Sequence, residues 1–319
     1  MLSNYHQSVL TLMSINVVAV TGVALLTGFT GLFSFGHAGY MSIGAYTAAM
    51  LVVRAKLPFL LALPLGGAMA CLVSLIMYPT LRLKGDYFAI AALGFGEAVR
   101  LIMDNGGTFT GGARGFPGIP TMTRLPVALV FAALALYFMR NILYSRFGRA
   151  LIAIREDRLA AQSLGINVAH SQMMSLAISA FYCGTAGGLF AFFMSFVQPR
   201  MFDMAKSTEL ASSIVFGGLG SLTGSAVAAG ILTSIPEVFR PLMTWRMVFY
   251  GLALVLTIVL RPSGLLGTWE LSVNGILKVF GVSRDWTPGS RPPAGTGAGA
   301  AGATGGLGPR TPGRSGGGK

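Results

Sequence analysis

Charged residues are scarce in this sequence of 319 residues. They make up 10% of the chain, whereas hydrophobic residues make up 53% and the mean hydropathy is +0.69. A soluble domain carries roughly 25% charged residues because its surface faces water, and a surface that faces lipid has no such need. The composition therefore excludes a water-soluble globular domain and predicts an all-α, polytopic transmembrane helical bundle.

Cysteine, histidine and acidic residues are also few. The two cysteines, Cys71 and Cys183, each lie in an apolar stretch, so no disulfide framework is expected. The three histidines are scattered without zinc-ligand spacing, and we expect neither a metal site nor a cofactor. The net charge is +13. Because most basic residues lie between apolar segments or after the last one, this charge fits membrane orientation and argues against a nucleic-acid partner.

Motifs for nucleotide chemistry are missing as well. No Gly-x4-Gly-Lys-Ser/Thr loop occurs, and Lys206-Ser207 has no glycine-rich lead. A membrane-embedded enzyme would need clustered carboxylates or histidines, and Glu97 stands nearly alone in its segment. The sequence therefore predicts a protein that is not an enzyme.

Apolar segments of about 20 residues, the length that crosses a bilayer as a helix, recur along the chain. They are Val9–Thr27, Gly39–Val53, Leu57–Tyr78, Asp86–Met103, Leu125–Tyr144, Met173–Phe196 and Met247–Leu260. A further stretch, Thr208–Val238, is apolar but is cut by the glycines of Gly217–Ser221. This stretch predicts a short helix, a glycine turn and a longer helix, so the bundle has about seven to nine membrane segments including a broken or re-entrant hairpin.

Basic residues predict the orientation. The Arg140–Gln172 connection and the chain after the last segment are rich in arginine and lysine, so both should be cytoplasmic. Counting from there puts the N-terminus and Asn105–Arg124 outside, and requires Thr208–Val238 to cross twice or to dip and return. Arg54 and Lys56 then fall outside, against the charge rule.

Two domains are expected. Residues 1–268 form the membrane domain, and residues 269–319 form a cytoplasmic tail rich in Gly, Pro and Ala. Such a composition cannot bury enough apolar surface to offset its ordering entropy, so we expect the tail to be disordered. Its charge could bring it to anionic membrane lipid.

Two places in the membrane segments carry polar groups that mark a candidate substrate path. Ser34, Gly36, His37 and Gly39 interrupt two apolar segments, as in transporters whose broken helices expose backbone to a substrate. The alternative is a tight interhelical loop in which His37 caps a helix or snorkels toward the membrane surface. Glu97 and Arg100 share one helix face, and either line the path or form a local ion pair.

Two connections are candidate docking surfaces. The external loop from Asn105 to Gly118 is rich in glycine, and it is either a surface for an external binding protein or a plain connector. The cytoplasmic excursion from Phe147 to Asn167 has helical spacing and is long enough for one short helix lying across the membrane surface. Its apolar positions, which could pack under the membrane domain or into a partner, are Leu151, Ile154, Leu159 and Leu164.

Seven motifs in order over residues 9–267 carry a family resemblance. They are Gly31–Ala38, Gly44–Tyr46, Leu83–Ile90, Thr110–Gly112, Gly148–Ile166, Phe216–Ser221 and Arg261–Gly267. Together they resemble the permeases of branched-chain amino-acid ABC importers of the LivM type. The resemblance implies a multi-pass protein of the bacterial inner membrane that forms half of a translocation path for branched-chain amino acids.

The resemblance also implies partners and a coupling element. The partners are a second permease, two cytoplasmic ATP-binding subunits that hydrolyse ATP, and a periplasmic or extracellular substrate-binding protein. The implied ATPase-coupling loop comprises Gly148, Arg149, Arg155, Glu156, Asp157, Ala160, Ala161 and Gly165. The family pattern is Glu-Ala-Ala-x3-Gly, and this chain has Leu159 where the glutamate would stand.

Two alternatives stay open on the sequence. A permease of the same family could carry urea, short amides or aromatic acids, because the external binding protein largely selects the ligand. A carrier that works without partners is the other.

Overall fold

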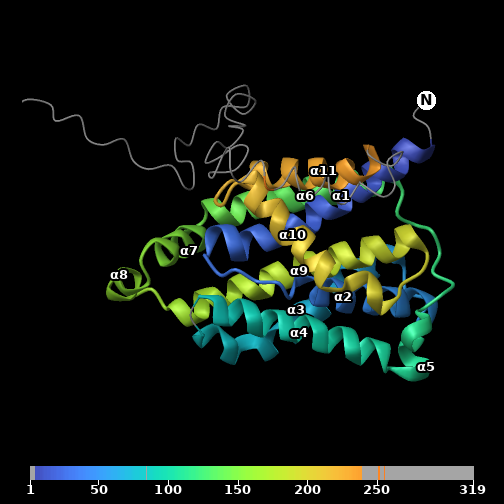
Figure 1. The fold of residues 1–319 in the computed structure, drawn as a ribbon, viewed down its shortest axis with the longest axis horizontal. Helices are drawn as coiled ribbons and strands as arrows, with labels where there is room; N and C mark the ends of the chain where they lie inside the picture. The colour runs from blue at the N-terminus through green and yellow to red at the C-terminus, as the bar shows by residue number, and fades with distance from the viewer. Residues whose placement is uncertain (1–3, 84, 239–250, 252–254, 256–319) are drawn as a thin grey trace, which may run out of the picture. The chain divides into compact units, whose positions relative to one another are not determined.

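The computed structural model describes residues 4–83, 85–238, 251 and 255 (Figure 1). Contacts within the chain divide it into two units, Met1–Gly289 and Ser290–Lys319, and every described residue belongs to the first. The predicted tail, its boundary at residue 268, and all but two residues of the predicted segment Met247–Leu260 lie outside the described residues.

The described chain is helical, and its one strand-like feature is an isolated bridge between Phe116 and Val197. The α-helices are α1 Asn4–Ala24, α2 His37–Val53, α3 Phe59–Ser74, α4 Asp86–Asp104, α5 Gly107–Thr110, α6 Leu125–Tyr144, α7 Arg146–Glu156, α8 Arg158–Ser163, α9 Val168–Met194, α10 Met204–Gly217 and α11 Leu222–Val238. A π-helix, η1 (Leu25–Phe29), extends α1, and a 3₁₀-helix, η2 (Leu75–Arg82), extends α3. Two further 3₁₀ turns are η3 Gly112–Arg114 and η4 Pro199–Phe202.

Four helices of the described chain are long and apolar enough to cross a membrane: Asn4–Phe29, Phe59–Arg82, Leu125–Tyr144 and Val168–Met194. All four coincide with predicted segments. The predicted break in Thr208–Val238 is confirmed, because α10 ends at Gly217 and α11 begins at Leu222. The predicted all-α polytopic fold is therefore confirmed.

Helix α9 is the centre of the bundle. Its apolar window is 83% buried, against 28% for α6, and α9 packs on α1, α2 and α3. Glycines permit this approach, since a Cβ added at Gly184 would lie 2.6 Å from the Cβ of Ala70 in α3. One added at Gly187 would overlap the carbonyl oxygen of Met41 in α2. Small residues at helix crossings are the usual means of close packing in lipid, where no water-driven burial pulls helices together.

The two connections predicted on opposite sides lie at opposite ends of the bundle. Figure 1 shows α5 at the end of the bundle where α1 starts, and α7 and α8 at the other end. The turn between α10 and α11 lies at the α7 end, because a Cβ added at Gly220 would be 3.1 Å from Nη1 of Arg155. Thr208–Val238 is thus a hairpin that returns toward the α5 end, as the parity argument requires.

Arg54 has a structural reason to break the charge rule. It follows α2 at the α5 end, where its Nη2 donates to the carbonyl oxygens of Thr108 and Phe109, both at 2.9 Å. Its guanidinium also lies 5.2 Å from the Phe109 ring centroid. A cation is favoured beside the unpaired carbonyls at the C-terminal end of a helix turn, so Arg54 is fixed by local contacts at this end.

Candidate functional site

The polar interruption predicted between two membrane segments separates η1 from α2. Gly31 follows η1 with φ of +76°, and the chain runs without helix until His37 begins α2. His37 is 1% exposed. Its Nε2 lies 2.9 Å from Oγ of Ser179 in α9, and its Nδ1 lies 3.4 Å from the carbonyl oxygen of Ser34. In this arrangement the imidazole closes the break onto α9, and the start of α2 has no side-chain cap.

The two glycines of this interruption pack it against α4. A Cβ added at Gly36 would overlap the carbonyl oxygen of Ala92, and one added at Gly39 would lie 3.0 Å from the Cα of Gly96. Any larger residue at either position would push the start of α2 away from α4. The structure therefore brings the Ser34–Gly39 interruption directly beside Glu97, the other predicted path element.

A cavity of about 290 Å³ lies at this junction, lined in part by Phe35, Glu97, Asp203 and Ser207. The first turn of α10 meets the first turn of α2 here, since the backbone N–H of Ala38 donates to Ser207 Oγ at 3.1 Å. At a rise of about 1.5 Å per residue, Glu97 is about 16 Å along α4 from its start, near the middle of the helix. Helix starts that meet beside the middle of a membrane helix are typical of transporter substrate sites.

Glu97 and Arg100 form an ion pair within α4. Arg100 Nε lies 3.0 Å from both carboxylate oxygens of Glu97, and the Glu97 side chain remains 43% exposed. The pairing expected of a local ion pair is therefore present, and Glu97 also faces the cavity. Among the described residues, no group of three histidines, cysteines or acids could hold a metal ion.

A second charged cluster joins α1, α10 and α11, and sequence reasoning missed it. Lys206 Nζ lies 3.0 Å from Glu209 Oε2 and 3.0 Å from Asn16 Oδ1. The Asn16 amide nitrogen donates to Glu209 at 3.2 Å and to Thr233 Oγ1 at 2.8 Å. Opposite charges three residues apart at the start of an apolar segment were the available signal. Asn16 closes the network, so the cluster ties the α10–α11 hairpin to α1.

The predicted cytoplasmic excursion folds as two helices, each with its own N-cap. Ser145 Oγ accepts from the N–H of Gly148 at 3.4 Å and starts α7. Asp157 Oδ1 accepts from the N–H groups of Leu159 and Ala160 at 2.8 and 3.0 Å and starts α8. Side-chain oxygens at N-caps satisfy amides that the helix leaves unpaired. The Asp157 carboxylate is therefore engaged in the turn between α7 and α8.

The apolar positions of the excursion divide between two faces. Leu151 and Ile154 of α7 are buried, and Ala161 of α8 packs with Ile154 in a small hydrophobic cluster. Leu159 and Leu164 are 74% and 79% exposed, and Leu159 also lines a cavity between the excursion and the membrane helices. Exposed leucines on a polar excursion are a surface that a protein partner would cover.

The remaining predicted loop residues attach this excursion to the membrane helices. Gly148 allows the tight α6–α7 turn, since a Cβ there would overlap the backbone of Leu143. Arg149 Nη1 donates to the carbonyl oxygen of Tyr144 at 3.1 Å. Both contacts hold the start of α7 against the end of α6.

Arg155 connects the excursion to two breaks in the membrane helices. Its Nη1 donates to the carbonyl oxygen of Gly28 in η1 at 2.7 Å, and its Nη2 pairs with Glu156 Oε1 at 2.8 Å. The same side chain lies against Gly31 and Gly220. A displacement of α7 would therefore also displace the η1–α2 interruption and the α10–α11 turn.

Comparison with known proteins gives one family. Residues 5–259 match the family model described as branched-chain amino acid transport system, permease component. The chain is 33% identical over 301 residues to the high-affinity branched-chain amino acid transport system permease protein LivM of Escherichia coli, covering 83% of this chain and 71% of LivM. It is 24% identical to LivH of Escherichia coli over 291 residues, covering 82% and 94%. It is 25% identical to BraD of Pseudomonas aeruginosa over 297 residues, covering 82% and 94%. No solved structure matches the chain.

Proposed function

The chain belongs to the family of permease components of branched-chain amino acid transport systems, and from that premise we propose that it forms half of the translocation path of an ATP-driven importer. The observation that carries the proposal is the match of residues 5–259 to the family, at 33% identity to LivM. The substrates we propose are branched-chain amino acids. The location is the bacterial inner membrane, where the apolar helices of the chain would span the bilayer.

The partners follow from the similarity to both LivM and LivH, two permease proteins of one kind of transport system. A second permease would supply the other half of the path. Two cytoplasmic ATP-binding subunits would supply the free energy, and an external binding protein would deliver the substrate. The Asn105–Gly118 loop at the α5 end is the surface we assign to the binding protein.

The ATPase contact is assigned to α8. Support comes from the exposed side chains of Leu159 and Leu164, which lie in and directly after α8. Helix α8 is at the end of the bundle opposite α5 (Figure 1). An ATPase that moves α8 also moves α7, and Arg155 passes the movement to η1 and to the glycine turn before α11. Both targets are breaks in helices, where a small movement needs few backbone hydrogen bonds to change.

The substrate path is assigned to the cavity beside Glu97. The start of α2, the start of α10 and the middle of α4 meet there, so motion of either broken element changes its lining. Gly36 and Gly39 hold the interruption against α4, and Ser34 and His37 fix its course. Arg100 pairs with Glu97 and keeps the carboxylate oriented at the cavity.

Reconstitution in proteoliposomes tests this function. The complete complex should import leucine only with ATP and the binding protein, and the lone chain should neither hydrolyse ATP nor transport. Leucine transport by the lone chain would instead identify a carrier without partners. Import of urea, short amides or aromatic acids in place of leucine would keep the permease and replace its substrate.

A further inference from the structure

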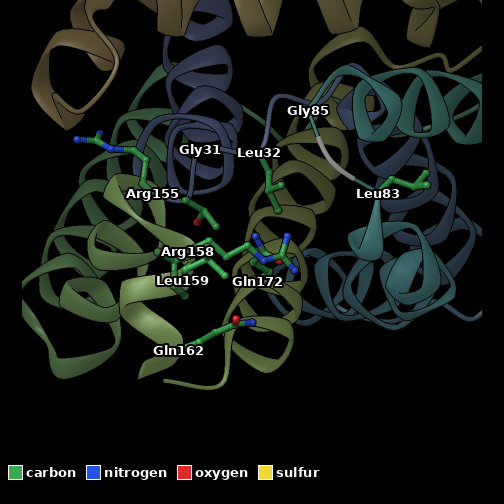
Figure 2. Close-up of a pocket in the computed structure, with 11 residues that line it drawn as sticks. Gly31, Leu32, Leu83, Gly85, Arg155, Arg158, Leu159, Gln162 and Gln172 are labelled. Carbon is green, nitrogen blue, oxygen red and sulfur yellow. The ribbon is translucent and has the colours of Figure 1, made fainter. Parts of the chain in front are cut away.

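A second cavity, of about 610 Å³, lies where α7 and α8 meet the membrane helices (Figure 2). Its lining comes from the segment after η1, the turn before α4, the two excursion helices and the start of α9. This volume falls within the range of about 300–1,000 Å³ usual for small-molecule sites. The cavity is at the end of the bundle opposite α5, and it is separate from the one beside Glu97.

Gln172 at the start of α9 is a buried polar group that lacks a partner. Its residue is 3% exposed, and no described residue donates a hydrogen bond to its Oε1. Leaving a buried carbonyl oxygen without a donor is unfavourable, and most such groups in folded proteins are paired. Because Gln172 lines the cavity, a ligand that brings an N–H donor would satisfy it.

Arg158 supplies a positive charge to the same cavity. Figure 2 shows its side chain extending toward Gln172, while the guanidinium of Arg155 points away. Arg155 is already bound to Gly28 and Glu156, whereas none of the three ion pairs among the described residues includes Arg158. A ligand carboxylate would match the planar fork of this guanidinium.

The rest of the lining is largely apolar, with side chains from Leu32, Leu83 and Ile154. A ligand that fits all three features carries a carboxylate, an N–H donor and an aliphatic body. We propose that this cavity binds a free aliphatic α-amino acid from the cytoplasmic side. Its carboxylate pairs with Arg158, and its ammonium donates to Gln172 Oε1.

The site rests on the proposed function for the identity of its ligand, and it adds a regulatory step to that function. A bound amino acid joins α8 to α9 and to the segments that lead into α2 and α4. It therefore favours the arrangement in which α8 lies against the bundle, and it opposes the movement that an ATPase on α8 would drive. Imported product that accumulates inside would slow further import.

Equilibrium binding tests the site directly. The complex of both permeases and both ATPases, without binding protein, is incubated with radiolabelled leucine, and leucinamide and 4-methylpentanoate compete. Leucinamide lacks the carboxylate and 4-methylpentanoate lacks the ammonium, so each should compete at least about tenfold more weakly than leucine, the scale of one lost charge-assisted hydrogen bond.

Gln172→Leu and Arg158→Gln should each weaken leucine binding about tenfold or more. His170→Leu, an exposed position on the same turn of α9 outside the lining, should bind like the wild type.

A second measurement tests feedback. Proteoliposomes are loaded with leucine, and each variant's import rate is divided by its own rate with an empty lumen. Luminal leucine should lower this ratio in the wild type and in His170→Leu, and Gln172→Leu should require about tenfold more leucine for the same effect. Equal competition by 4-methylpentanoate would overturn the amino-acid assignment, as would the absence of leucine binding to the complex of both permeases and both ATPases. Normal leucine import without inhibition by luminal leucine would refute this site alone. Binding of luminal leucine by a complex that imports another solute would refute the proposed substrate and leave the site unaffected.

Discussion

Replacement of Gly165 should uncouple the ATPase from the permease while leaving the bundle folded. Gly165 follows α8 with φ of +80°. Its N–H donates to the carbonyl oxygen of Gln162 at 2.9 Å, and the N–H of Ile166 donates to that of Ala161 at 3.1 Å. These two bonds form a Schellman motif, the usual end of a helix at a left-handed glycine. They fix where α8 stops and the chain turns back to α9.

The expected magnitude comes from the backbone alone. A Cβ added at Gly165 would have no neighbour within 4 Å, so the added Cβ itself meets no clash. A left-handed conformation costs a residue with a Cβ roughly 1–2 kcal/mol, and a β-branched side chain more. Helix α8 has only 6 residues. A helix so short cannot sustain itself, and it should fray when its end is strained.

We therefore expect a graded series. Gly165→Asn should stay near the wild type because asparagine tolerates the left-handed region, Gly165→Ala should be intermediate, and Gly165→Val should be worst. A loss of roughly 1–2 kcal/mol in the docked loop corresponds to about a 5- to 30-fold reduction in coupling. The measurements are affinity of the ATPases for the permease pair, substrate-stimulated ATPase activity and leucine uptake.

Gly118→Val is the matched control. Gly118 has φ of +81° and equally open surroundings, but it lies in the loop at the α5 end of the bundle. The backbone strain is then the same, and ATPase affinity should not change. If Gly165→Val imports leucine normally and binds the ATPases with unchanged affinity, α8 is not the coupling element.

Three further outcomes are expected. Asn16→Leu should lower the stability of the purified permease pair by about 1–3 kcal/mol, because it removes the Asn16 hydrogen bonds to Lys206 and Glu209. An unchanged melting temperature would show that the network does not contribute to stability. Arg155→Lys should keep ATPase binding but lower leucine uptake per ATP hydrolysed, since a lysine cannot reproduce both contacts of the guanidinium, to Gly28 and to Glu156. An unchanged ratio of leucine imported to ATP hydrolysed would remove Arg155 from the coupling route. Single cysteines at Ser163 and Phe109, both exposed, should react with impermeant reagent from opposite sides of the membrane, and labelling of both from outside would overturn the orientation.

Features with a local cause could be predicted from the sequence. The family is confirmed by the match over residues 5–259, and membership in a transport family confirms that the chain is a transport subunit. The bounds predicted for Leu125–Tyr144 are the observed ones, because Arg124 precedes and Ser145 follows a largely apolar run. The glycine break before α11 is also predictable, since glycine has a low helix propensity and consecutive glycines favour the end of a helix.

Features with a distant cause could not be predicted. The π-helix η1 has an ordinary apolar sequence, and its irregular backbone is held by Arg155, which lies 127 residues away from Gly28. The second cavity gathers side chains from five segments, none of which carries a motif for a ligand. The sequence predicts one short helix in the excursion; the structure has two, because Asp157 leaves the helical conformation with φ of −151° and caps α8.

The two charged pairs show why sequence spacing alone does not assign a role. Glu97 and Arg100 are three residues apart in α4, and Lys206 and Glu209 have the same spacing in α10. The α10 pair is closed by Asn16 from another helix, so its hydrogen bonds are met inside the bundle and it holds helices together. The α4 pair makes no hydrogen bond to a third side chain among the described residues, although Asp104 and Asp203 act on Arg100 electrostatically, and the carboxylate of Glu97 borders a cavity beside two helix starts. A partly buried pair whose hydrogen bonds are completed by a third side chain resists change, whereas a pair that faces a cavity can exchange its partner for a ligand at smaller cost. The α10 pair differs from the α4 pair because Asn16, 193 residues away from Glu209, completes its hydrogen bonds. We therefore expect the α4 pair, and not the α10 pair, to lie on the substrate path.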